Sequence, residues 1–497
     1  MPLRRDIQFM RNGRVVHLDG PPTLTLLDYL RLHEHAIGTK EGCAEGDCGA
    51  CTVVLRRVTD GKVAYQPVNS CILLAGQADG ADVITVEDLA DEPADGGALH
   101  PVQQALVDKH GSQCDFCTPG FVMALFGLYH APHRDKLGRH AVNDWIAGNL
   151  CRCTGYRPIV DAALAACADD GDDRFAKQDG AVARALGALD DGNDVFAGND
   201  QRFFAAPASI AAMAALYQKH PDATLIGGAT DVGLWITKQL RDLPKIIWLG
   251  RVKGLDDIED KADAIGFGAS VSHETARAHL ASIDPDLGEM MRRFASLQVR
   301  NAGTIGGNIA NASPIGDLPP ALIALDVTLT LQAGDATRTL ALENFFIDYG
   351  KQDRAKGEFV RAVRVPKLKG DERFRCYKVA KRFDQDISAV MGAFKITLEG
   401  SRVSAARVAF GGMAGIPKRA AATERALRGL DLNTPGDWDA VIATLDSDYQ
   451  PLTDQRGSAA YRSEVARALL RKALIEIAGT ATRATRVIGI REAADAS

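Results

Sequence analysis

Cysteine placement restricts the fold of this sequence more than any other feature. Eight of the ten cysteines lie in two tight groups within the first 153 residues, and the last 330 of the 497 residues contain only Cys376. A disulfide framework would instead spread its cysteines through a small secreted domain. Cysteines gathered at one end of a long chain indicate metal ligation in a reducing compartment. The N-terminal part must therefore fold around two groups of sulfur ligands.

Length and composition limit the class of protein. About three or four domains are expected for 497 residues, and 46% apolar with 25% charged residues is ordinary for a soluble globular protein. No apolar run approaches the ~18–20 residues that span a bilayer, and the basic start has no apolar signal segment behind it. A net charge of −6 argues against a nucleic-acid binder. We expect a cytoplasmic protein without nucleic-acid or membrane partners.

The first 82 residues show the signals of a small mixed α/β unit. Apolar runs on both sides of Asn12-Gly13 predict a hairpin, since Asn-Gly favours the tight turn. A short amphipathic helix is expected at 26–30, and a second strand pair should turn at Asp60-Gly61.

The next segment, 83–168, is expected to be helical. Helices are predicted over 101–110, from Thr118 onward and over 158–167. Thr118 would be the N-cap residue, with Pro119 at the first helical position.

Beyond 168 the sequence changes character twice. The Ala-, Asp- and Gly-rich segment 169–195 shows no sustained apolar face and is expected to be a linker. From about 200, strand-like apolar runs such as 246–249 and 359–365 alternate with helices and glycine-rich turns. These patterns predict units at 1–82 and 83–168, the linker at 169–195, units at 196–370 and 371–485, and a tail at 486–497.

The first cysteine group has the plant-type ferredoxin spacing for one 2Fe–2S cluster. Cys43, Cys48 and Cys51 are spaced C-x4-C-x2-C, and Cys71 follows. Gly42, Gly46 and Gly49 let the backbone curl closely around a compact anionic object. Zinc sites usually pair two C-x2-C knuckles, whereas one end of this group is a single cysteine. The spacing therefore predicts a cluster.

The second group is less specific. It consists of Cys114-x2-Cys117 and Cys151-x-Cys153. C-x-C is unusual for zinc, so a cluster is favoured, but spacing alone leaves zinc open. Cys167 belongs to neither group and, like Cys376, is expected to be a small buried hydrophobic residue.

No standard nucleotide-binding fingerprint is present. Segment 266–271 lacks the third glycine of the Rossmann pattern, and no Walker loop occurs. Two other glycine-rich loops, at 225–233 and 300–311, could let backbone N–H groups approach a pyrophosphate. Taken alone, such loops are ordinary turns more often than nucleotide sites.

Segments Gln113–Gly120 and Gly148–Pro158 resemble the second-cluster motifs of the xanthine dehydrogenase / aldehyde oxidase family of molybdenum hydroxylases. The resemblance covers nearly the whole chain and implies a second 2Fe–2S cluster at 114–153. It also implies a multidomain α+β fold. This fold would comprise a β-grasp ferredoxin domain, a four-helix 2Fe–2S domain, an α+β FAD-binding domain of the vanillyl-alcohol oxidase type and an α/β C-terminal flavoprotein domain.

The resemblance also implies the residues of a flavin site. Both glycine-rich loops would cradle the FAD pyrophosphate, and Lys378 would lie at the pyrimidine edge, although a solvated lysine is the plain alternative. Ala229 stands where relatives often carry Asn, and Gly316 where Ser is common, which weakens those two contacts. The implied FAD residues are Leu225, Ile226, Gly227, Gly228, Ala229, Thr230, Asp231, Val232, Phe294 (beside the isoalloxazine), Thr304, Ile305, Gly306, Gly307, Asn308, Asp317 (an acidic position), Val360 (an apolar contact) and Lys378.

The function implied is electron transfer. In this family a molybdopterin centre hydroxylates the substrate, and electrons pass through two clusters to FAD and on to an acceptor such as NAD⁺. The predicted domains leave no room for molybdopterin, so the centre is expected on a large partner subunit, in an α2β2 assembly, with no catalytic residue on this chain. Joining both cluster domains to the flavin domain is typical of bacterial xanthine dehydrogenase small subunits. This favours oxidation of hypoxanthine and xanthine to urate.

Three alternatives stay open at this level. The partner could hydroxylate aldehydes or other N-heterocycles. The chain could be an independent ferredoxin-type flavin reductase or a redox sensor, although no DNA-binding or signalling module is visible. A zinc-stapled binding scaffold is the third.

Overall fold

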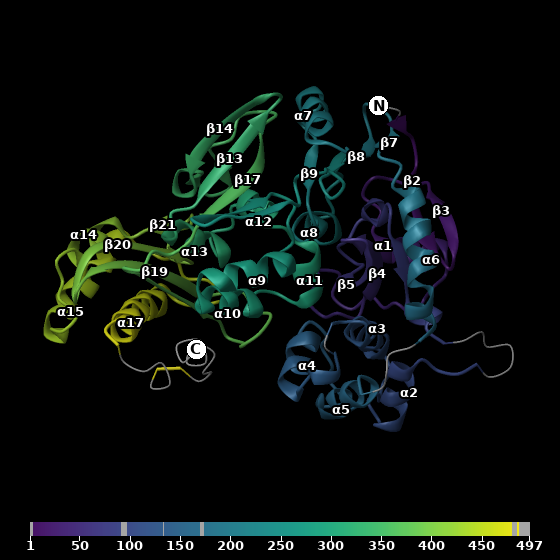
Figure 1. Cartoon of the computed structure of the whole chain (residues 1–497), viewed down its shortest axis with the longest axis horizontal. Helices are drawn as coiled ribbons and strands as arrows, with labels where there is room; N and C mark the ends of the chain where they lie inside the picture. Colours follow the sequence, from purple (N-terminus) through teal and green to yellow (C-terminus); the bar gives the residue numbers. More distant parts are fainter. Residues whose placement is uncertain (1–2, 91–96, 133, 169–172, 480–484, 487–497) are drawn as a thin grey trace. The chain divides into compact units, whose positions relative to one another are not determined.

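A computed structural model describes residues 3–90, 97–132, 134–168, 173–479 and 485–486 (Figure 1). The chain divides into two compact units. Unit 1 contains residues 1–253 and 295–303, and unit 2 contains residues 254–294 and 304–497. None of the described helices combines the length and the apolar character that a bilayer crossing requires.

Unit 1 begins with a mixed five-stranded sheet in the order β3-β2-β6-β4-β5. Asn12 and Gly13 turn the first hairpin with φ of 52° and 70°, and Asp60 and Gly61 turn the second with 51° and 74°, so both predicted hairpins are present. The predicted helix at 26–30 is a single turn, α1 (Leu26–Asp28), which continues as a π-helical segment. The strands are β2 (Ile7–Arg11), β3 (Arg14–Leu18), β4 (Thr52–Thr59), β5 (Lys62–Asn69) and β6 (Asp82–Ile84).

Four helices follow the sheet, in agreement with the predicted four-helix domain. α3 is apolar on almost every side and is buried in the middle of the group, which is the usual place for such a helix. The predicted cap needs correction: Cys117 occupies the N-cap position, and Thr118 is the first helical residue. The Thr118 hydroxyl instead contacts that of Ser112. The helices are α2 (Pro101–Asp108), α3 (Thr118–Tyr129), α4 (Arg139–Ile146) and α5 (Arg157–Ala166).

The segment expected to be a linker contains a long helix, α6 (Arg174–Leu189). Its apolar residues Phe175, Val182 and Leu186 are seven and four positions apart, so they share one buried face. This face packs against the first sheet, where Met10 joins Val182 and Leu186 in one cluster. The prediction of no sustained apolar face was therefore wrong. Only three large apolar residues form this face, and the many alanines between them make their helical spacing hard to recognise.

A second five-stranded sheet completes unit 1, in the order β1-β7-β8-β10-β9. The strand-like run predicted at 246–249 falls on its β10. The strands are β1 (Leu3–Arg4), β7 (Asp194–Gly198), β8 (Phe203–Ala206), β9 (Thr224–Ile226) and β10 (Lys245–Trp248), with helices α7 (Ile210–Lys219), α8 (Val232–Thr237) and α11 (Leu297–Ala302).

Unit 2 contains a five-stranded antiparallel sheet in the order β11-β12-β17-β13-β14. A core of apolar side chains joins it to four helices. The strands are β11 (Ile258–Asp260), β12 (Ala264–Gly268), β13 (Thr328–Ala333), β14 (Ala336–Ala341) and β17 (Phe359–Pro366), and the helices are α9 (His273–Ile283), α10 (Pro285–Arg293), α12 (Ile305–Asn311) and α13 (Leu318–Ala324).

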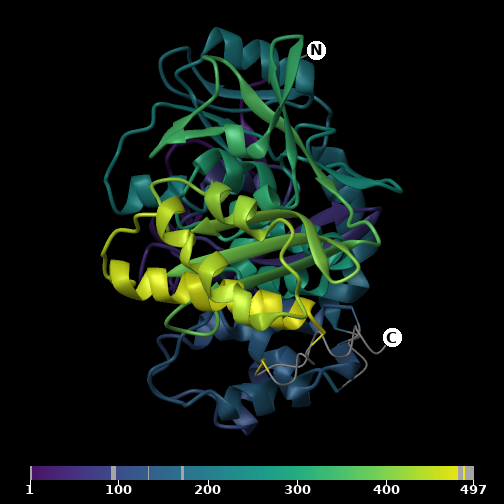
Figure 2. The ribbon, with the colours of Figure 1, turned by 90° about the vertical axis from the view of Figure 1, so that its left-hand side faces the viewer.

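A four-stranded antiparallel sheet, β18-β19-β20-β21, forms the rest of unit 2. Side chains alternate along its strands, so one face packs on α13 and the other carries α14 and α17 (Figure 2). Cys376 is buried on the first face, and Cys167 is buried among the four helices of unit 1, as predicted. The elements are β18 (Glu372–Val379), β19 (Val390–Glu399), β20 (Arg402–Gly411), β21 (Lys418–Arg419), α14 (Ala421–Leu427), α15 (Trp438–Ala443), α16 (Leu445–Asp448) and α17 (Ala459–Ile477). Apart from Arg486, the predicted tail at 486–497 lies outside the described residues.

Candidate cofactor sites

The first four cysteines converge where β4 begins and β5 ends. Hydrogen bonds from the Cys48 and Cys71 thiols, with the backbone N–H groups of Glu45 and Asp47, hold the pKa of Cys43 well below its ordinary value despite burial. Cys51 also contacts Cys71. A loop that already directs backbone N–H groups at sulfur fits an anionic thiolate cluster.

The second four cysteines converge between the helices of unit 1. The Sγ atoms of Cys114 and Cys153 lie 3.7 Å apart, and Cys117 contacts Cys151. Burial raises the pKa of Cys117 to about 12. Cys151 Sγ accepts hydrogen bonds from the backbone N–H and the hydroxyl of Thr154, at 3.4 and 3.2 Å. Cys114 and Cys153 are exposed at the protein surface.

The spacing within both groups disfavours a single zinc ion. A tetrahedral site with Zn–S bonds of about 2.3 Å places its sulfurs about 3.8 Å apart. In the described chain, only His100, His130 and Asp173 bring three possible ligand atoms within 4.8 Å of one another. Neither cysteine group brings three sulfur atoms within 4.8 Å of one another. The wider spacing fits four thiolates shared between two irons.

The first glycine-rich loop lies between β9 and α8 in unit 1. Among the described residues, the backbone N–H groups of Gly228, Ala229 and Thr230 find no hydrogen-bond acceptor. A Cβ at Gly228 would lie 1.9 Å from the carbonyl oxygen of Ala302, so only glycine fits. Ala229 has a φ of 56°, which asparagine adopts more readily than alanine. N–H groups without an acceptor fit the oxygens of a pyrophosphate.

The second loop forms the first turn of α12 in unit 2 and differs in one respect. Its N–H groups are already used: Ile305 donates to Val271, Gly306 to Ala269, and Gly307 to the Thr304 hydroxyl. The Asn308 Oδ1 atom, however, is buried and has no partner among the described residues. The Asn308 side chain, rather than the backbone, is therefore the polar group of this loop that remains for a ligand.

Lys378 is buried in unit 2, which rules out the alternative of a solvated lysine. Its Nζ donates to Asp317 Oδ2 at 2.6 Å, and the two side chains are 1% and 5% exposed. Ser388 bridges the pair, because it accepts from Lys378 at 3.0 Å and donates to Asp317 at 2.5 Å. Sequence reasoning missed Ser388, since only the pairing of β18 with β19 brings it to this place.

The two apolar FAD candidates lie in the core of unit 2. Val360 is 5% exposed on β17, and Phe294 follows the end of α10, half-buried against the same core. The Phe294 ring lies 4.7 Å from that of His273, centroid to centroid. These contacts set the orientation of the Phe294 ring.

Four family models match the chain in order and cover most of its length. Their descriptions are "2Fe-2S iron-sulfur cluster binding domain" at 9–76, "[2Fe-2S] binding domain" at 85–164, "FAD binding domain in molybdopterin dehydrogenase" at 199–368 and "CO dehydrogenase flavoprotein C-terminal domain" at 375–477.

Curated relatives extend this match over nearly the whole chain. Xanthine dehydrogenase of Emericella nidulans is 32% identical over 526 residues, which are 93% of this chain and 38% of that protein. The chain belongs to the molybdenum hydroxylase family. It carries the 2Fe–2S and FAD-binding domains of this family, and it spans little more than a third of the length of the curated relatives it matches.

Two solved structures share the fold of part of the chain. Carbon monoxide dehydrogenase of Hydrogenophaga pseudoflava matches with a TM-score of 0.52 and 26% identity, over 55% of this chain and 95% of that one. Quinoline 2-oxidoreductase of Pseudomonas putida 86 matches with a TM-score of 0.50 and 25% identity, over the same shares of the two chains.

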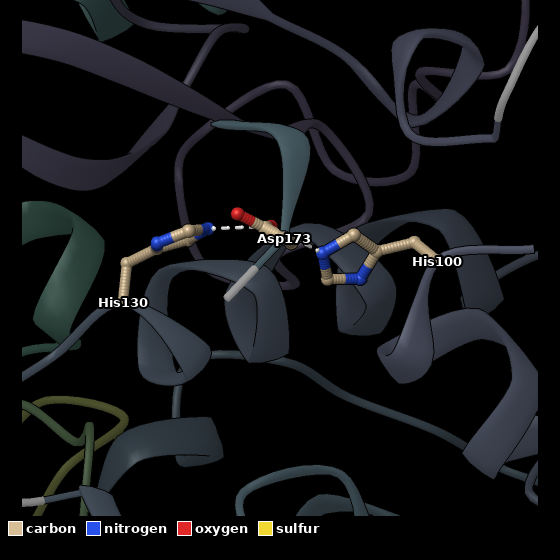
Figure 3. Close-up of side chains that lie close together, drawn as sticks. All are labelled: His100, His130 and Asp173. Carbon is tan, nitrogen blue, oxygen red and sulfur yellow. Dashed lines mark hydrogen bonds and ion pairs between the residues drawn. The ribbon is translucent and has the colours of Figure 1, made fainter. Parts of the chain in front are cut away.

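A further cluster in this chain, His100–His130–Asp173, has the composition of a metal site (Figure 3). Both Nε2 atoms lie near Asp173 Oδ2, at 2.8 and 3.1 Å. However, His100 Nδ1 accepts the backbone N–H of Val102, so its proton must be on Nε2. A metal at Nε2 would need the opposite tautomer. The cluster is therefore a hydrogen-bonded triad that joins the N-cap residue of α6 to α2 and α3.

The triad gives the first testable prediction. Burial alone would raise the pKa of Asp173, but hydrogen bonds from His100 and His130 outweigh it and lower the pKa. The stability this provides is fully present above the unfolded pKa of about 4 and is lost as pH falls through the folded pKa. We expect Asp173→Asn to lower the free energy of unfolding at pH 7 by about 1–3 kcal/mol.

Urea unfolding from pH 7 downward measures this effect. The difference between wild type and Asp173→Asn should hold to about pH 4 and narrow below it. A difference that vanished already at pH 6 would show that the Asp173 charge is not the cause.

The Thr304 hydroxyl gives a second prediction, for the flavin site. Thr304→Val removes the acceptor of the Gly307 N–H and should cost about 1 kcal/mol, with weaker retention of FAD. Thr304→Ser keeps a hydroxyl and should behave as wild type. Flavin content after gel filtration measures the difference, and equal flavin content in the two variants would contradict the prediction.

Proposed function

We propose that this chain is the electron-transfer component of a molybdenum-dependent xanthine dehydrogenase. The observation that carries the proposal is the convergence of eight thiols into two groups of four, in a chain whose other half matches a flavin-binding model. Bound 2Fe–2S clusters exchange single electrons, and a flavin exchanges one or two. Clusters and flavin together can therefore convert between one-electron and two-electron transfer. The proposed cluster ligands are Cys43, Cys48, Cys51, Cys71, Cys114, Cys117, Cys151 and Cys153.

The flavin is proposed to be held by both glycine-rich loops. Free N–H groups at 228–230 would bind pyrophosphate, with Asn308 as a further polar contact. Lys378, held by Asp317 and Ser388, would place a cation by the ring, where it favours negative charge on the reduced flavin.

Substrate chemistry is proposed to take place on a partner. Xanthine dehydrogenase relatives support oxidation of hypoxanthine and xanthine to urate, with NAD⁺ as the acceptor. We propose that molybdopterin lies on a large partner subunit in an α2β2 assembly, and that no residue of this chain acts on the purine. The reducing cytoplasm is the proposed location, since it would keep eight thiols reduced.

A sibling hydroxylase is the second candidate. The solved structures of similar fold include carbon monoxide dehydrogenase and quinoline 2-oxidoreductase. Their similarity supports the same electron-transfer role beside a partner with a different substrate.

The test is cofactor analysis of the anaerobically purified chain, followed by a substrate screen with its molybdopterin partner. We expect about four irons, two in each cluster, together with one FAD. Cys43→Ser and Cys114→Ser should each remove one cluster, whereas Cys376→Ser should remove none. Zinc in place of iron would refute the proposal, and xanthine oxidation by the chain alone would refute the assignment of substrate chemistry to a partner.

A further inference from the structure

The two cysteine loops touch through their backbones in unit 1. The backbone N–H of Leu150 donates to the carbonyl oxygen of Cys48 at 2.9 Å. Leu150 directly precedes Cys151, so the two groups of sulfur ligands are joined by a single hydrogen bond between main chains. The approach is close: a Cβ at Gly49 would lie 2.4 Å from the carbonyl oxygen of Gly148. Any shift of one loop must therefore move the other.

A buried network of side chains lies beside this contact. Asn149 Nδ2 donates to the carbonyl oxygen of Gly49 at 3.0 Å and to the Thr52 hydroxyl at 3.3 Å. Gln298 Nε2 donates to Asn149 Oδ1 at 2.8 Å and to the same hydroxyl at 3.3 Å. Asn149, Gln298 and Thr52 are each 1% exposed. Because water is excluded, these hydrogen bonds hold the loops in one arrangement.

Gln298 brings a third element to the contact. It lies on α11, within the segment that matches the flavin-binding model. α11 packs against β5, where Asn301 donates to the carbonyl oxygen of Pro67 at 2.9 Å. A Cβ at Gly148 would lie 2.3 Å from Gln298 Oε1. The helix therefore closes directly over the point where the two loops meet.

We propose that Asn149 and Gln298 are positioning residues that fix the separation and orientation of the two cysteine groups, and so set how strongly the two bound clusters interact. The inference rests on the proposed function, because both groups must hold clusters. Both side chains bond to the backbone of the first loop, to Thr52 or to each other. They therefore hold Gly49 and Thr52 against Asn149, next to the Cys48–Leu150 contact.

Low-temperature EPR of the reduced full-length protein tests the inference. Two reduced clusters split each other's signals by a magnetic interaction that falls steeply with distance and depends on orientation. We expect Asn149→Ala and Gln298→Met to retain wild-type iron content and to show reduced splitting. Asn143, an exposed asparagine on α4, provides the control, and Asn143→Ala should leave the splitting unchanged.

Unchanged splitting in the two iron-replete variants would overturn the inference, as would a wild-type protein that holds both clusters without any splitting. If Asn149→Ala loses iron, Gln298→Met decides, because its side chain lies outside both cysteine loops. Loss of iron from Gln298→Met as well would overturn the inference, because Gln298 would then be required for binding the clusters rather than for spacing them. Wild-type protein without iron in either group would instead count against the proposed function.

Discussion

Gly120→Ala should remove iron from at least one of the two cysteine groups. Gly120 is in the first turn of α3, three residues after Cys117, and a Cβ there would lie 2.2 Å from the carbonyl oxygen of Gly49 and 3.1 Å from the Ala50 Cα. These are backbone atoms of the first loop, so no side chain can turn away. We expect iron to fall from about four per chain to about two or fewer, with a loss of about 1–3 kcal/mol in the free energy of unfolding.

A matched glycine on α6 provides the control. Gly187 is an exposed helical residue with no atom within 4 Å of its potential Cβ. Gly187→Ala should raise stability by about 0.5–1 kcal/mol and leave iron unchanged. Iron analysis and urea unfolding of the purified variants measure both effects. A Gly120→Ala protein with full iron and wild-type stability would disprove the close contact between the loops.

Lys378→Met should be among the most destabilising substitutions in unit 2. It leaves Asp317 as a buried carboxylate without its cation, and breaking such a pair costs about 3–5 kcal/mol. Ser388 can still donate to Asp317 but cannot neutralise it. FAD retention should fall in parallel, because Lys378 is the proposed cation at the flavin. Urea unfolding followed by flavin analysis measures both quantities.

A second variant distinguishes the unpaired Asp317 charge from a simple loss of packing as the cause of the destabilisation. Asp317→Asn in the Lys378→Met background removes the stranded charge and should restore part of the stability. Lys381→Met is the control for removing a lysine, since Lys381 is exposed and its side chain bonds only to the carbonyl oxygen of Gln455 among the described residues. It should change stability by less than about 0.5 kcal/mol. If Lys378→Met and the double variant lost the same free energy of unfolding, the unpaired Asp317 charge would not be responsible.

Local signals in the sequence predicted local structure well. The turns at Asn12-Gly13 and Asp60-Gly61 were found because their residue types favour a positive φ. The helix over α6 was missed because its apolar face depends on three residues spread over three turns. Thr118 was misplaced by one position, since the chain places Cys117 at the start of the helix. Errors of this kind arise where several residues fit the same local rule.

In the candidate sites, too, local spacing predicted some features and only the tertiary structure decided others. Short spacing identified the cysteines, because a ferredoxin loop must supply three sulfurs within nine residues. Nothing local revealed that the N–H groups at 228–230 find no acceptor in the described part of the chain, while those at 305–307 are already used. The two glycine-rich loops look alike as sequences, and only the neighbouring strands and turns distinguish them.

The sequence by itself determined which ligands this chain can offer: eight thiols at cluster spacing and two glycine-rich loops. It could do so because covalent spacing limits what a short loop can reach. The tertiary structure alone decided which groups meet: Cys48 with Leu150, Asn149 with Gln298, and Lys378 with Asp317 and Ser388. Each of these contacts joins residues on different elements. Their formation depends on strand pairing and helix packing, which no local pattern encodes.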